Sequence, residues 1–242
     1  MKNIFSYQII KQSFKCVWIW WLISIVVTAM NLFAFPSIEG VDSSTLVAKF
    51  AQEGIGGNGI LFITICGVLF ANVLITNEVD RGTLAITLNT PTTRLQILLS
   101  KALIFITLIP SIALFVGIGG SISPLIYGLD FDHTKWWLIM ALWSLYSMAI
   151  SGIAFAIGCW FNKSRYTIAI ASIILASFFL LNMFAGIESL EFCKYFTLQT
   201  LFDISAIING DSVVWQMIAL PIIAIPFYLI GIMRFLKKDL PL

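Results

Sequence analysis

The residues whose types and spacing could do chemistry lie mainly in one short charged segment, residues 77–94, between two long apolar runs. Glu78, Asp80, Arg81 and Arg94 bring both signs of charge into this segment. A compact helix with both signs suits docking into a groove of a partner protein, because complementary charge sets the orientation of such a contact. A solvated connector is the alternative, and the residue types alone leave both open.

The charged segment is predicted to be helical from Glu78 to Leu88 and then to break. The break falls at Thr90-Pro91, where threonine can cap a new helix and proline can occupy its first position. Arg94 and Lys101 then mark the edge of the next apolar run.

No catalytic or metal site is predicted. The sequence has no G-x-x-x-x-G-K-[ST] phosphate loop, no H-E-x-x-H zinc motif and no G-x-S-x-G nucleophile elbow. The single histidine, His133, lies beside two tryptophans and is interpreted as a solvated loop residue. The four cysteines have no metal-ligand spacing. We therefore expect no enzymatic activity, metal or cofactor in this chain itself.

Amino-acid composition indicates the class of protein that carries this charged segment. The chain has 242 residues, of which 60% are hydrophobic and 11% charged, and its mean hydropathy is +0.98. Soluble domains carry about 25% charged residues. A soluble enzyme and a nucleic-acid-binding protein are therefore poor interpretations. We expect a single transmembrane domain over residues 1–242.

Six uncharged apolar runs are long enough to cross a bilayer as helices, and they do not alternate as barrel strands would. The predicted fold is an all-α integral membrane protein with six transmembrane helices, an N-terminal interfacial helix and a cytoplasmic coupling helix. The predicted spans cover residues 17–35, 59–76, 102–128, 136–161, 166–187 and 213–233.

The distribution of charge predicts the orientation. With both termini in the cytoplasm, 11 of the 14 basic residues fall on the inner side and nine of the 12 acidic residues on the outer side. We expect a multi-pass protein of the cell membrane, in contact with its lipids, with both ends cytoplasmic.

Segments outside the spans give three further expectations. Apolar residues at helical spacing before Val17, with Lys11 and Lys15 one turn apart, predict an interfacial helix on the cytoplasmic leaflet, with an early start of the first span as the alternative. The glycine-containing segment 36–58 is predicted to be a flexible loop. Segment 188–212 is predicted to form short helices at the outer interface.

The polar groups inside the predicted spans are amides and hydroxyls. Asn31, Asn72 and Asn182 are candidates for a cargo path, although such groups more often bridge helices. Ion-coupled carriers place ionisable residues at membrane depth. Their absence from the six runs indicates that any transport takes its energy from a partner.

Three segments resemble one known family. N-E-x-x-x-G-T-L from Asn77, then T-P-x-x-R ending at Arg94, then Lys101 seven residues later, resemble the transmembrane subunit of a type-2 ABC exporter. The segment from Phe196 to Gly210, which lacks the proline often found early in it, and the tail from Phe235 are similar to that family as well.

The resemblance implies a permease that pairs with a second permease, the same or homologous, and docks on a separate ABC ATPase, which binds MgATP. It implies that the helix from Glu78 is the coupling helix, that Glu78 is its leading contact and that Arg81 lies beside it. The coupling residues implied are Asn77, Glu78, Asp80, Arg81, Gly82, Thr83, Pro91, Arg94 and Lys101.

The cargo expected from this resemblance is amphipathic or hydrophobic: a peptide, toxin, antibiotic or lipid leaving the cytoplasm, with peptide-toxin and antimicrobial-peptide exporters as the group expected. Nucleic acid is not expected as a partner. The alternatives are a stand-alone secondary carrier or channel, and a non-transporting immunity or scaffold protein of the membrane.

Overall fold

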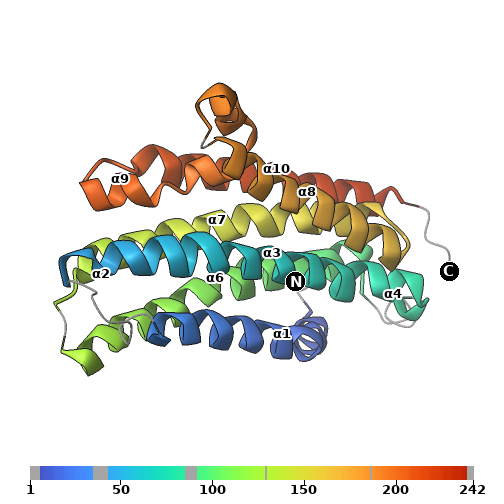
Figure 1. The fold of residues 1–242 in the computed structure, drawn as a ribbon. Coiled ribbons are helices and arrows are strands. Elements are labelled where there is room, and N and C mark those ends of the chain that lie inside the picture. Colours follow the sequence, from blue (N-terminus) through green and yellow to red (C-terminus); the bar gives the residue numbers. More distant parts are fainter. Residues whose placement is uncertain (1–5, 35–42, 85–91, 129, 186, 239–242) are drawn as a thin grey trace.

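The computed structural model describes residues 6–34, 43–84, 92–128, 130–185 and 187–238. Helices, and no strands, form this described part, and six of them are long and apolar enough to cross a membrane (Figure 1). The chain is thus an all-α, multi-pass membrane protein. Its elements are α1 (Tyr7–Ala34), α2 (Ser43–Lys49), η2 (Phe50–Gly59), α3 (Ile60–Ala71), η3 (Asn72–Thr76), α4 (Asn77–Asp80), α6 (Arg94–Tyr127), α7 (His133–Trp160), α8 (Ser164–Ala185), η4 (Glu188–Phe196), η5 (Leu198–Leu201), α9 (Ile204–Asn209) and α10 (Val214–Leu236).

The second spanning helix is continuous from Leu46 to Asp80 and includes two π-helical stretches, η2 and η3. The prediction of a flexible loop over 36–58 is therefore wrong for residues 43–58, which are helical; residues 36–42 lie outside the described part. Phe50 and Ile55 are fully buried in this stretch, so packing outweighs the low helix propensity of its glycines. A Cβ on Gly59 would lie 3.0 Å from the ring of Trp143, which indicates close packing on α7.

Helix α1 is unbroken from Tyr7 to Ala34, so the predicted N-terminal helix is not separate from the first span. In Figure 1 its first turns are nevertheless seen almost end-on, whereas the rest of the helix runs along the bundle. The Trp21 indole N–H donates to the Leu108 carbonyl and to the Ser111 hydroxyl, both at 2.9 Å, and so fixes α1 to α6.

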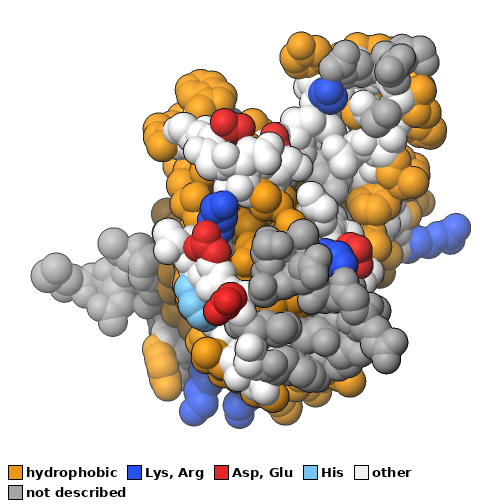
Figure 2. Space-filling model, turned by 60° about the vertical axis from the view of Figure 1, so that its left-hand side comes forward, with side chains coloured by type: hydrophobic (Ala, Val, Ile, Leu, Met, Phe, Trp, Pro, Cys, Tyr) orange, Lys and Arg blue, Asp and Glu red, His pale blue; other side chains and the backbone are white. Residues whose placement is uncertain are grey.

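The two ends of the bundle differ in charge. One end, where α4, α7 and α10 finish and α6 and α8 begin, holds most of the basic side chains. The described charged residues there are Lys11, Lys15, Glu78, Asp80, Arg81, Arg94, Lys101, Lys163, Arg165, Arg234, Lys237 and Lys238. The opposite end is turned forward in Figure 2 and holds Glu53, Asp130, Asp132, Asp203 and Asp211 with Lys49, Lys135 and Lys194.

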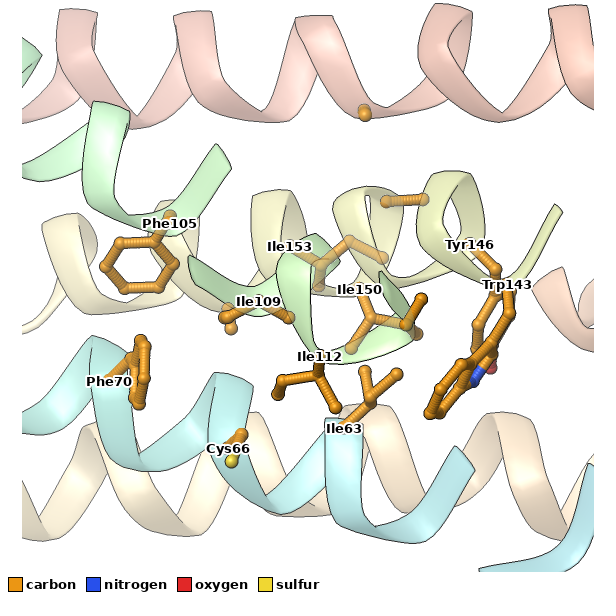
Figure 3. Close-up of a cluster of buried hydrophobic side chains, with 14 of the residues drawn as sticks. Ile63, Cys66, Phe70, Phe105, Ile109, Ile112, Trp143, Tyr146, Ile150 and Ile153 are labelled. Carbon is orange, nitrogen blue, oxygen red and sulfur yellow. The ribbon is translucent and has the colours of Figure 1, made fainter. Parts of the chain in front are cut away.

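Helix α7 forms the centre of the bundle, packed against α10, α6, α3 and α8. Trp143, Tyr146 and Ile150 of α7 face Ile63 of α3 and Ile112 of α6 in one apolar cluster (Figure 3). Small residues let backbones approach α7, as expected for the fourth predicted span: a Cβ on Gly158 would lie 3.0 Å from the Ala71 carbonyl oxygen.

Most helices extend beyond the predicted spans. α6 begins at Arg94 rather than near residue 102, so Lys101 lies inside a spanning helix, and the second spanning helix includes Glu53, Glu78 and Asp80. The helices as they form therefore include ionisable residues, although the six apolar runs within them contain none. In segment 188–212 the predicted short helices are present as η4, η5 and α9.

Candidate functional site

The charged segment between the second and third spanning helices lies at the basic end of the bundle (Figure 1). Three contacts fix its flanks to neighbouring helices: an ion pair from α6, a carboxylate cap on α8, and a threonine bonded to α7 and α8.

Lys101 of α6 is almost fully buried, with 2% of the residue exposed. Its ammonium donates to the Glu78 carboxylate at 2.5 Å and to the backbone carbonyl of Leu74. Burying an ammonium group is costly unless it is paired and hydrogen-bonded, and both conditions are met here. The Glu78 side chain, which is 21% exposed, thus points mainly into the bundle rather than outward.

The helix that carries Glu78 ends at Asp80, and the chain turns at Arg81 and Gly82. Gly82 has φ of +70°, a conformation that glycine adopts at little cost and other residues rarely adopt. The prediction of one helix from Glu78 to Leu88 is therefore wrong: the helix breaks at Arg81–Gly82 because that turn needs left-handed backbone. A new helical turn starts at Thr83.

We call residues 81–83 the elbow. Arg81, Gly82 and Thr83 are all exposed, and the Thr83 hydroxyl donates to the Glu78 carbonyl at 3.3 Å. The Arg81 backbone N–H donates to the carbonyl of Asn77, the first residue of α4. The elbow is thus an exposed turn directly attached to a helix that is anchored inside the bundle.

The segment re-enters the bundle at Arg94. Thr93 caps α6 by accepting from the Gln96 N–H at 3.2 Å, while the Gln96 side chain accepts from the Thr93 N–H at 2.9 Å. This capping box lets α6 start while still outside the apolar run. The predicted cap at Thr90 and Pro91, which the family resemblance implied as a coupling residue, lie outside the described residues.

Asp80 and Thr76 connect the same helix end to α7 and α8. The Asp80 carboxylate accepts from the Ser164 N–H at the start of α8, at 3.0 Å. The buried Thr76 hydroxyl donates to the Gly158 carbonyl at 3.1 Å and lies 2.9 Å from the Thr167 hydroxyl. The helix that precedes the elbow is therefore bonded to α6 through Lys101 and to α8 through Asp80.

Lys238 fixes the end of α7 from the other side. Its ammonium donates to the backbone carbonyls of Cys159 at 3.1 Å and Phe161 at 2.7 Å. Carbonyls at the C-terminal end of a helix have no partner within the helix, so Lys238 supplies one for α7. Burial lowers the pKa of Lys238 to about 8, and the nearby charge of Arg234 acts in the same direction. The guanidinium of Arg234 lies 4.8 Å from the centre of the Trp160 ring.

This lowered pKa predicts a pH dependence of stability. Between about pH 8 and the ordinary lysine pKa of 10.5, the unfolded chain retains the Lys238 proton that the folded chain has lost. The unfolded state then binds more protons, so the free energy of unfolding should rise with pH in that window. Below the window the destabilising Lys238 contribution is fully present and no longer changes with pH. The test compares the free energy of unfolding of the wild type and of Lys238→Met at pH 7.5 and at pH 10, and the rise between the two pH values should be larger in the wild type. An equal change in both proteins would contradict the assignment.

The three asparagines of the predicted path lie on three different spanning helices. Asn182 lines a cavity near the acidic end of the bundle, whose lining includes neither Asn31 nor Asn72. Asn31 lies near the end of α1, and Asn72 begins η3.

Sequence reasoning missed several residues of this site. Thr76, Thr167 and Lys238 were not candidates, because a hydroxyl in an apolar run and a basic tail are both common features. Only Thr93 carried a readable signal, the T-x-x-Q spacing of a capping box. The described side chains form no group of three or more His, Cys, Asp or Glu that could hold a metal ion.

Comparison with known proteins adds one match. The model of a protein family described as "Protein of unknown function (DUF2705)" matches residues 17–241, from the apolar part of α1 to the tail after α10. No curated protein matches the chain. The match covers both the elbow and the cavity lined by Asn182.

Proposed function

The chain belongs to the DUF2705 family, and we propose that it is the membrane-spanning permease subunit of an ATP-driven ABC exporter. Its cargo is amphipathic or hydrophobic, such as a peptide, toxin, antibiotic or lipid. ATP is hydrolysed on a separate partner ATPase, and a second permease completes the assembly. The observation that carries the proposal is the exposed elbow, anchored by the buried Glu78–Lys101 pair.

The elbow has the mechanical properties that a coupling contact needs. Its side chains are exposed to a partner, while the helix behind it is fixed to α6 by Lys101 and to α8 by Asp80. Closure of two ATPase subunits would press on the elbow and move these helices together. Arg81 is the exposed charge of this contact, and Glu78 supports it from inside.

Charge supports a cytoplasmic position for the elbow. Ten basic and two acidic described residues gather at its end of the bundle, as the positive-inside rule requires of the cytoplasmic side. In this orientation both termini are cytoplasmic, and the first turns of α1, with Lys11 and Lys15, lie along the inner leaflet.

The proposal predicts that an ATPase with a phosphate loop co-purifies with the chain from membranes of its source cells. Arg81→Glu should lower the amount of co-purified ATPase and its ATP hydrolysis at least about fivefold, because charge reversal at a contact costs on the order of 1 kcal/mol or more. Glu53→Lys is the matched control: it reverses an exposed charge at the opposite end of the same helix and should change neither quantity.

Other outcomes would favour the alternatives. If the purified chain alone moves cargo down an ion gradient in vesicles, it is a secondary carrier or channel. If no ATPase co-purifies and no cargo moves, a non-transporting immunity or scaffold role replaces the exporter.

A further inference from the structure

A cavity of about 670 Å³ opens near the acidic end of the bundle, far along the second spanning helix from the elbow. η2 and the start of α3 form one wall, the end of α8 forms a second, and the segment from η4 to α9 closes it. Figure 2 shows this end of the molecule with a hollow between two projecting lobes. The volume is in the range of cavities that bind drug-sized ligands.

The lining combines apolar and hydrogen-bonding groups. Ile60, Ala185, Phe202 and Ile204 supply apolar surface, and the exposed Tyr195 ring stands at the edge. The polar lining residues are Gln52, Asn182, Lys194, Gln199, Thr200, Asp203 and Ser205. This mixture fits an amphipathic ligand better than a purely apolar one.

Gln199 is the residue that points to a ligand. It is only 8% exposed, and its buried side-chain oxygen has no hydrogen-bond partner within the described part of the chain. A buried acceptor without a partner is costly, so such a group calls for a donor. Gln199 also lines the cavity, so its carboxamide can turn and accept an N–H from a ligand bound there.

The backbone around Gln199 is held in place. The Thr197 hydroxyl donates to the Phe178 carbonyl of α8 at 2.9 Å and accepts from the Gln199 N–H at 3.2 Å. One side-chain oxygen thus fixes the start of η5 to α8. Because the backbone is held in this way, only the carboxamide has to turn toward a ligand, and the ordering cost of binding stays small.

Charge selects the sign of the ligand. Asp203 lines the cavity and is exposed; one of its oxygens caps α9 by accepting from the Ala206 N–H at 3.1 Å. Lys194 also lines the cavity, but the described residues at this end include five carboxylates and three lysines. The resulting negative field favours cations.

We propose that this cavity binds an amphipathic organic cation that carries N–H donors. The Gln199 side-chain oxygen accepts a ligand N–H, Asp203 stabilises the positive charge, and the apolar wall covers the ligand's hydrocarbon or aromatic part. The binding is a property of this chain alone, so its test needs neither nucleotide nor an ATPase and is independent of the proposed export function.

Three dyes with one xanthene framework separate charge from hydrogen bonding. Rhodamine 6G is a cation with two N–H groups, tetramethylrhodamine methyl ester is a cation without N–H, and fluorescein is an anion. Fluorescence anisotropy is measured with the purified full chain in lipid nanodiscs, and empty nanodiscs are subtracted. We expect saturable binding of rhodamine 6G, at least fivefold weaker binding of tetramethylrhodamine methyl ester, and no saturable binding of fluorescein.

Two variants locate the site. Gln199→Leu removes the acceptor and should weaken rhodamine 6G binding at least fivefold while changing tetramethylrhodamine methyl ester binding less than twofold. Asp203→Asn retains an oxygen for the α9 cap but loses the charge, and it should weaken both cations about threefold. Gln216→Leu is the control, because Gln216 also has a buried unpartnered oxygen but lies outside the cavity.

The proposal is overturned if rhodamine 6G does not saturate, if fluorescein binds equally well, or if Gln199→Leu and Gln216→Leu have the same effect. Thermal melting of each variant distinguishes loss of the site from loss of the fold. Should Gln199→Leu unfold, the dye comparison and Asp203→Asn still decide the outcome.

Discussion

Lys101→Met is expected to lower the free energy of unfolding by about 3–5 kcal/mol, the range for removing one partner of a buried ion pair. The methionine leaves the Glu78 carboxylate and the Leu74 carbonyl without the ammonium that now bonds both. Since 21% of the Glu78 side chain is exposed, partial hydration should place the loss near 3 kcal/mol. Tryptophan fluorescence during denaturation in detergent measures it.

The matched control for Lys101→Met is the double variant Lys101→Met/Glu78→Met. Replacing both charges by apolar groups of similar length removes the unpaired carboxylate, so at least half of the lost stability should return. A loss below 1 kcal/mol in the single variant, or a double variant no more stable than the single, would show that the pair does not anchor the helix end.

Gly120→Ala should cost about 3 kcal/mol, the upper end for adding one methyl group to a packed core. A Cβ at this position of α6 would lie 2.2 Å from the indole of Trp136. That indole is fully buried, has Phe50 and Phe131 around it at ring-centre distances of 6.0 and 5.7 Å, and donates its N–H to the Gly117 carbonyl at 2.9 Å. It has no free direction in which to move.

Two variants test the cause of the Gly120→Ala effect. Gly57→Ala adds the same methyl where nothing lies within 4 Å, and its stability should equal that of the wild type or exceed it by up to about 1 kcal/mol, because alanine has the higher helix propensity. Trp136→Phe in the Gly120→Ala background should cost less than the sum of the two single changes, because the smaller ring makes room. Simple additivity would mean that the methyl and the indole do not meet.

The number of spanning helices could be predicted from the sequence because it depends on local apolar length. The ends of these helices could not be predicted, because a helix continues through charged residues wherever other parts of the fold supply hydrogen-bond or ion-pair partners for them. Helix α6 starts at Arg94, well before the apolar run. Lys101 can lie inside this helix because the Glu78 carboxylate and the Leu74 carbonyl accept hydrogen bonds from its ammonium group. No local pattern reports that pairing across the chain.

Two predictions about helix extent were wrong in opposite directions, and both involve glycine. The helix that was predicted to continue to Leu88 ends before Gly82, whose φ is +70°. In η2, glycines that predicted a loop are held in a helix by the burial of Phe50 and Ile55. The cavity was equally hidden: Asn182 was a candidate by type, but Gln199 becomes notable only when packing leaves its oxygen buried without a partner.

The helix from Leu46 to Asp80 changes its winding twice, in η2 and η3. A π turn holds one residue more than an α turn. If the π turn moves along the helix by one residue, the side chain at the position that it passes rotates about the helix axis by about 100°. Gln52, which lines the cavity, lies in η2, and Leu74, whose carbonyl holds Lys101, lies in η3. A shift of either π turn would therefore change which side chains face the cavity or which carbonyl faces Lys101, while the rest of the helix keeps its position.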